Sequence, residues 1–143
     1  PTEAAAVVAA TIPDSRTAGT VVSSYANLAL FERVQFIITV GEMAATSTLN
    51  ASILQGTSSA GAGAKALTTA KAITELTATD DDKIVIINVL AEDLDMANEF
   101  DFAAVSVTVA NAAVDYAVIC IGHNPRYAPA SDNDSTAVDE IVS

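Results

Sequence analysis

The segment Phe100–His123, FDFAAVSVTVANAAVDYAVICIGH, constrains the fold more than any other part of this 143-residue chain. Its first half alternates Val105, Val107 and Val109 with smaller or polar residues, which is the period of a β-strand with one buried face. Its second half is apolar on both faces beyond Asp115. A strand that is apolar on both faces needs a second cover besides its own core. The segment therefore predicts a hairpin of two strands, joined by a short Ala-Asn-Ala turn, and a surface that packs against something else.

The same period of two recurs upstream. It extends over residues 33–40, 49–53 and 83–90, with a shorter pattern at 73–77. Short strands separated by turn signals predict an all-β domain, a β-sandwich or a jelly roll. The link GEMAATST is short enough to make a hairpin of the first two strands. Residues 56–72 are rich in Gly, Ser, Thr and Ala, and they predict a loop.

Both ends of the chain lack a clear strand pattern. We expect an extended N-terminal arm at residues 1–22, a β-sandwich core domain at 23–127 and a C-terminal tail at 128–143. Pro1 fits the residue that follows a removed initiator Met, and the N-terminal stretch lacks the basic start of a secretion signal. These features predict a protein made in the cytoplasm.

The charge of the chain excludes several classes of partner. Eighteen acidic residues against six basic ones give a net charge of −12. Binding to nucleic acid depends on Lys and Arg that displace counterions, so no nucleic-acid partner is expected. The same charge disfavours an anionic membrane surface, and no stretch approaches the roughly 18 consecutive apolar residues of a membrane span.

The sequence predicts neither an active site nor a cofactor. The only histidine, His123, and the only cysteine, Cys120, lie on opposite faces of one strand and cannot form a nucleophile–histidine pair. Cys120 is expected to be a small buried apolar residue. The acidic segment 92–101 has oxygen ligands that suit calcium, but it lacks the EF-hand spacing, so a solvated acidic loop is the preferred interpretation. We therefore expect a protein that is not an enzyme and holds no metal.

The candidate functional residues are apolar side chains with no place in a single core. Two groups stand out: the second faces of the strands, Ile84, Ile86, Ile119 and Ile121, and the possible anchors of the two ends, Ile12, Val138 and Ile141. Two interpretations of the four strand isoleucines remain open. They form either a surface between subunits or an intramolecular core beneath covering loops.

Four segments resemble a family of small proteins encoded in the structural gene clusters of tailed phages: FERVQFIITVGEM, STLNASILQGTSS, LTATDDDKIVIINV and GHNPRYAPAS. The resemblance covers roughly Val34 to Pro129 and rests on strand patterns, and the segment QGTSSAGAG departs from it by being longer and richer in Gly and Ala.

The resemblance implies a virion component without catalytic activity. The role that fits best is a capsid decoration, or cement, protein. Such a protein would form a homotrimer, bind the major capsid protein on the outer capsid surface and stabilise the joints between its subunits. The alternatives are a tail, neck or fibre component, and a receptor- or carbohydrate-binding β-sandwich module. The last is weakened by the absence of Trp and the scattered positions of the three tyrosines.

Overall fold

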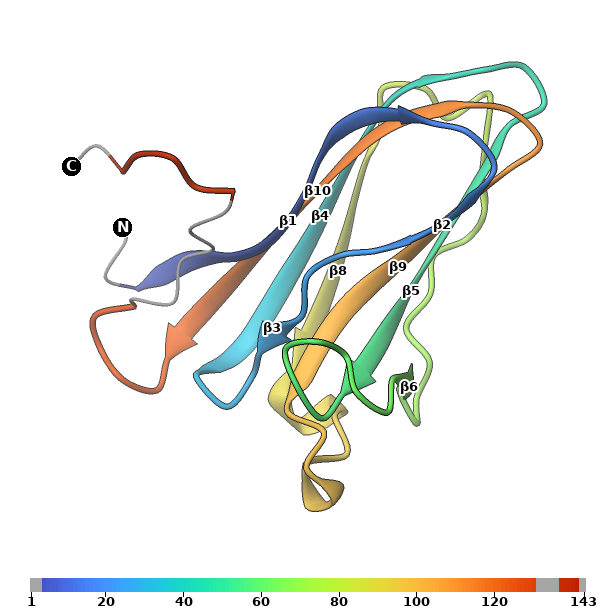
Figure 1. The fold of residues 1–143 in the computed structure, drawn as a ribbon. Helices are drawn as coiled ribbons and strands as arrows, with labels where there is room; N and C mark the ends of the chain where they lie inside the picture. The colour runs from blue at the N-terminus through green and yellow to red at the C-terminus, as the bar shows by residue number, and fades with distance from the viewer. Residues whose placement is uncertain (1–3, 131–136, 142–143) are drawn as a thin grey trace.

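The computed structural model, which describes residues 4–130 and 137–141, is a sandwich of two antiparallel β-sheets (Figure 1). Sheet A contains, in spatial order, β1 (Ala5–Arg16), β10 (Val114–Pro125), β4 (Phe31–Met43) and β8 (Ile84–Leu90). Sheet B contains β2 (Gly19–Val22), β9 (Phe102–Ala110), β5 (Thr48–Gly56) and β6 (Lys65–Ala66); β3 (Ala26–Asn27) also pairs with β9, and β7 (Leu76–Thr77) with β5. Two 3-10 turns, η1 (Ala91–Asp93) and η2 (Met96–Asn98), connect β8 to β9. The predicted all-β sandwich is confirmed.

The core lies between the two sheets and follows the period of two. In β9, Val105, Val107 and Val109 are buried, and they face apolar residues of sheet A. In β10, the buried row is Val114, Tyr116, Val118 and Cys120. Full burial of a side chain as large as valine stabilises the fold by about 1.5–3 kcal/mol, so these rows hold the sheets together. Cys120 is a buried free thiol, as the sequence predicts.

The two predicted hairpins are wrong. β4 lies in sheet A and β5 in sheet B, and likewise β9 and β10 belong to different sheets. Each connection therefore crosses from one layer to the other, and the backbone N–H of Ala44 in the first crossing donates to the carbonyl oxygen of Ala113 in the second. Thr46 and Asn111 adopt positive φ angles of 72° and 67° within these crossings. A short link fixes neighbours in sequence, but it does not decide whether two strands share a sheet or face each other across the core.

Residues 5–22 lie in the two sheets rather than forming an extended arm. β1 pairs along β10 and becomes one edge of sheet A, and β2 pairs with β9 in sheet B. Ala6, Val8 and Ala9 of β1 are buried in the core. The register of β1 shifts between Val7 and Ala9 and again between Thr11 and Asp14. Such bulges add an extra residue to the strand, so they interrupt the alternation by which a strand is recognised in a sequence.

Candidate interaction surface

The outer face of sheet A carries a continuous row of apolar side chains. The register places Ala10, Ile119, Ile37 and Ile86 side by side across all four strands. Ile121 follows next to Ile119 in β10, and Ile84 next to Ile86 in β8. We call the set Ile37, Ile84, Ile86, Ile119 and Ile121 the isoleucine face. The structure thus brings together all four strand isoleucines that the sequence singled out.

These side chains are accessible to solvent in the single chain. Ile84 is 65% exposed, Ile86 54% and Ile119 42%, while Ile37 and Ile121 are half-buried. No other described segment covers this face, so the isoleucines are not part of the intramolecular core. Large contiguous apolar patches are rare on monomeric proteins and mark interaction sites. The isoleucine face is therefore the strongest candidate for a functional surface in the described part of the chain.

Ile37 is the member of this face that the sequence reasoning missed. It follows Phe36 and precedes Ile38, both of which are fully buried. The adjacent pair Ile37-Ile38 was the available signal, since two neighbouring residues of one strand point to opposite faces.

Polar residues border the isoleucine face at one end. The amide of Gln35 in β4 donates to the side-chain oxygen of Asn88 in β8 over 3.0 Å. Arg33 and His123 are cross-strand neighbours one row further on. His123 therefore lies away from the buried Cys120, in agreement with the predicted opposite faces.

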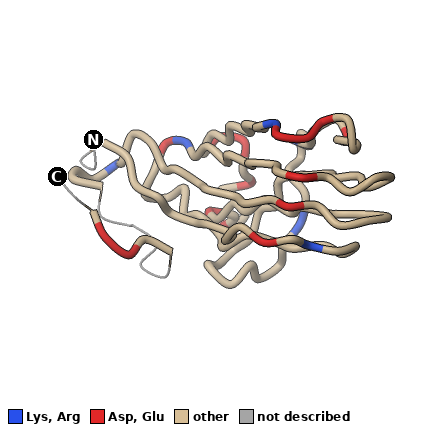
Figure 2. Tube along the Cα trace, turned by 90° about the horizontal axis from the view of Figure 1, so that it is seen from above, with Lys and Arg blue, Asp and Glu red and all other residues tan. Residues whose placement is uncertain are grey.

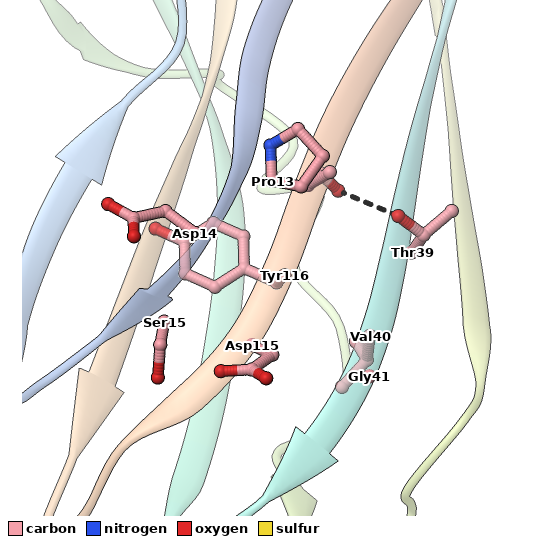
Figure 3. Close-up of a pocket in the computed structure, with 9 residues that line it drawn as sticks. Pro13, Asp14, Ser15, Thr39, Val40, Gly41, Asp115 and Tyr116 are labelled. Atoms are coloured by element: carbon pink, nitrogen blue, oxygen red, sulfur yellow. Dashed lines mark hydrogen bonds between the residues drawn. The ribbon is translucent and has the colours of Figure 1, made fainter.

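A cleft of about 450 Å³ borders the face at its other end (Figure 3). It lies where β1, β10 and β4 come together, and Pro13, Asp14, Thr39, Asp115 and Ala117 are among the residues that line it. Register shifts in β1 and at the start of β10 coincide at this place. The carboxylates of Asp14 and Asp115 give the cleft a negative charge.

A tyrosine lies at the base of this cleft. Tyr116 is buried, and its hydroxyl oxygen has no hydrogen-bond partner in the structure. Burial raises the pKa of the Tyr116 hydroxyl above its ordinary value. The guanidinium of Arg16 lies 5.5 Å from the ring centroid, a cation–π contact, and its Nε is also unpartnered. The cleft offers hydrogen-bonding groups and negative charge, but no paired nucleophile and base.

The outer face of sheet B has the opposite character. The hydroxyl groups of Thr20 and Thr108 form a hydrogen bond of 2.8 Å, and the amide of Asn50 donates to Glu75. Ser52 and Ser106 are cross-strand neighbours in the same sheet. A polar outer face needs no second cover. Val22 is the exposed apolar residue on this face, 42% exposed and paired with Ser106, so the two outer faces of the sandwich differ and the continuous apolar row lies on sheet A.

Two carboxylates of the acidic segment 92–101 form ion pairs with lysines. Asp93 forms an ion pair of 2.6 Å with Lys71, and Asp95 one of 2.8 Å with Lys65. The hydrogen bond from Lys65 lowers the pKa of Asp95, and Asn98 contributes in the same direction. Across residues 4–130 and 137–141, no group of three or more His, Cys, Asp or Glu side chains could hold a metal ion.

The expected anchors of the two ends do not gather in one place. Ile12 belongs to β1 and is 69% exposed. Val138 is half-buried, and Ile141 is 47% exposed. The described residues of the tail, 128–130 and 137–141, contain no strand, although Ala130 reaches the core.

Comparison of the chain with protein-family models, with curated proteins and with solved structures finds no match. In the described ranges, no helix is long and apolar enough to cross a membrane.

Proposed function

We propose that this protein is a non-enzymatic structural protein of a phage virion, a capsid decoration protein that binds the outer surface formed by the major capsid protein. The observation that carries the proposal is the isoleucine face, an uncovered apolar surface on a sandwich whose other face is polar. A one-sided molecule of this kind suits attachment to a shell, with sheet A against the capsid and sheet B toward solvent.

The mechanism is addition of buried area at subunit joints. An interface of standard size, about 1,600 Å², of which rather more than half is apolar, yields a gross term of about 20 kcal/mol at about 25 cal/mol per Å². Most of this free energy is offset by the loss of translational and rotational freedom and by the ordering of side chains on association. When the subunits of one oligomer bind to neighbouring sites, the first contact raises the effective concentration for the others, so the oligomer binds the shell more tightly than one subunit would. The symmetric shell repeats each contact. The bound protein would raise the barrier to rupture of the shell.

The charge of the molecule supports a basic partner surface. Eighteen acidic residues against six basic ones give a net charge of −12, and Figure 2 shows that acidic residues are spread over several parts of the trace. The cleft next to the isoleucine face adds Asp14 and Asp115 at its margin. Lys or Arg side chains of the capsid protein would complement these carboxylates, and complementary charge favours specificity and rapid association.

The proposed assembly state is a homotrimer placed at a threefold or quasi-threefold position. Closed point groups are the common solution for identical subunits, and a trimer matches the local symmetry of a hexamer-based shell. A tail, neck or fibre component is the second candidate, and the copy number per particle separates the two. A decoration protein would be present in hundreds of copies, whereas a tail component would be present in few.

The test is binding of the purified protein to shells that lack it, with Ile119→Lys as the disrupting variant. Lysine at the centre of the isoleucine face places a charge in the proposed interface, so we expect occupancy of the shells to fall at least about tenfold, since an unpaired charge in a desolvated interface costs more than 1.4 kcal/mol. Thr108→Lys, on the outer face of sheet B, is the matched control and should bind like the unaltered protein. Equal binding of all three proteins, or occupancy limited to one vertex, would contradict the proposal.

A further inference from the structure

The strand β8 forms one edge of sheet A, and its backbone is exposed to partners along that edge. The N–H of Val40 donates to the carbonyl oxygen of Lys83, so Lys83 directs its backbone toward β4. In an antiparallel ladder every second residue of a strand does the same. Val85, Ile87 and Val89 consequently direct their backbone groups toward β4. The backbone N–H and C=O groups of Ile84, Ile86, Asn88 and Leu90 point the other way, to the free edge.

Two side chains close one half of this edge. The ammonium of Lys71 donates to the carbonyl oxygen of Asn88 over 3.0 Å, and Asp93 accepts the N–H of Leu90 over 2.7 Å. Lys71 and Asp93 are themselves bound to each other. Edge strands are commonly protected by charged side chains, and this pair protects β8 from Asn88 onward.

The other half of the edge is open. In the described chain, the outward N–H and C=O groups of Ile84 and Ile86 have no hydrogen-bond partner. Neither residue is charged, and their side chains are the two most exposed of the isoleucine face. An unpaired, apolar, β-branched edge is a template for pairing with another strand. We propose that the edge at Ile84–Ile86 binds an extended segment of a partner protein by β-strand addition.

The groups on the open edge of β8 indicate which residues the partner segment should contain. Two outward residues offer two N–H and two C=O groups, so about four main-chain hydrogen bonds are available. The partner's side chains on the same side would pack against Ile84 and Ile86, which favours valine, isoleucine or threonine there. Beyond Ile84 the partner would pass the acidic turn Asp80–Asp82, so lysine or arginine is expected at that end. At the other end, the Lys71–Asp93 pair limits the length of the added strand.

A basic segment fits better than a second copy of this chain. Each copy carries a net charge of −12, so two copies repel each other. Antiparallel pairing of Ile84 with Ile86 of a second copy would also bring the acidic turn of one copy toward the Asp93 region of the other. The proposal adds a binding mode to the proposed function, and its test uses the purified chain alone, so the failure of one is distinguishable from the failure of the other.

The experiment combines a peptide probe with two variants at one position. The probe is a blocked peptide of six alternating threonine and valine residues with two lysines at one end. A second peptide carries two glutamates in their place. In Ile86→Pro the outward N–H is lost, while no hydrogen bond of the ladder to β4 is removed, because proline is tolerated on the free side of an edge strand. Ile86→Thr is the matched control that keeps the N–H and shortens the side chain. Thermal unfolding first verifies that both variants fold.

Binding is followed by NMR titration and amide hydrogen exchange. We expect the lysine peptide to slow exchange of the Ile84 and Ile86 amides by about tenfold, with smaller effects at Val85 and Ile87. Ile86→Pro should weaken binding of the lysine peptide more than Ile86→Thr does. The affinity of the unaltered protein for the glutamate peptide should be at least about threefold lower than its affinity for the lysine peptide. Equal binding to the proline and threonine variants would overturn the proposal, since the side chain alone would then account for it. Protection of the two amides that rises with protein concentration, without peptide, would overturn it in favour of a second copy.

Discussion

At the scale of single residues, burial decides the chemistry of the groups that look reactive. Cys120 is fully buried in β10, where Phe36 and Ala9 are its cross-strand neighbours. Burial raises the pKa of the Cys120 thiol above its ordinary value, because the thiolate would be poorly solvated there. Burial also raises the pKa of the Tyr116 hydroxyl, four residues earlier in the same strand. The sequence predicted the buried thiol correctly because a free cysteine in the middle of an apolar strand usually behaves as a small buried apolar residue.

The native protein should resist thiol reagents and lose stability in alkali. The thiol of the unfolded chain ionises near its ordinary pKa of about 8.5, whereas the folded thiol stays protonated. Ionisation therefore favours unfolding, and the contribution of this thiol to the free energy of unfolding should be constant below about pH 8 and decline as the pH rises through 9. Urea unfolding at a series of pH values measures this. Cys120→Ala should remove the decline between pH 8 and 9.5, and reaction with a disulfide reagent should require unfolding. Rapid reaction of the native thiol would refute the assignment.

At the scale of elements, the sequence identifies strands better than it identifies their neighbours. Alternation located β4, β5, β8, β9 and β10 to within a few residues, because each strand has one strictly apolar face. It did not reveal that consecutive strands lie in opposite sheets, since both arrangements bury the same faces. It missed β1 as a strand because two bulges interrupt its period. The isoleucine face was partly predictable, whereas the cleft and the open half of the β8 edge arise from register and bulges.

Gln55 at the end of β5 ties three elements together. Its side chain is fully buried; its oxygen accepts the backbone N–H of Asp95 over 2.8 Å, and its amide donates to the carbonyl oxygen of Ala66 over 3.1 Å. Gln55→Leu would leave both partly buried backbone groups without this partner. We expect a loss of about 2–4 kcal/mol in the free energy of unfolding, measured by urea titration. Asn50→Ala, on the exposed side of the same strand, should change stability by no more than about 0.5 kcal/mol. A similar effect of the two substitutions would show that the Gln55 hydrogen bonds are dispensable.

At the scale of the whole molecule, one apolar face and a large negative charge oppose each other. The isoleucine face favours association, while the net charge of −12 keeps copies of the chain apart. The balance between these two forces depends on salt, because the Debye length falls from about 10 Å at 0.1 M to about 3 Å at 1 M. A protein built in this way can remain dispersed until it meets a surface of complementary charge.

This balance predicts how the mass of the protein in solution responds to salt. Until a shell covers it, the isoleucine face of the free protein favours self-association, so light scattering coupled to size exclusion should show the mass rising above that of one chain as salt increases, since screening removes repulsion while apolar contacts persist. Ile119→Lys should stay at the mass of one chain at every salt concentration, and Thr108→Lys should follow the unaltered protein. A trimer that dissociates as salt increases would instead indicate an interface held by ion pairs. A single chain under all conditions would leave the isoleucine face to the capsid partner alone, so that assembly takes place only on the shell.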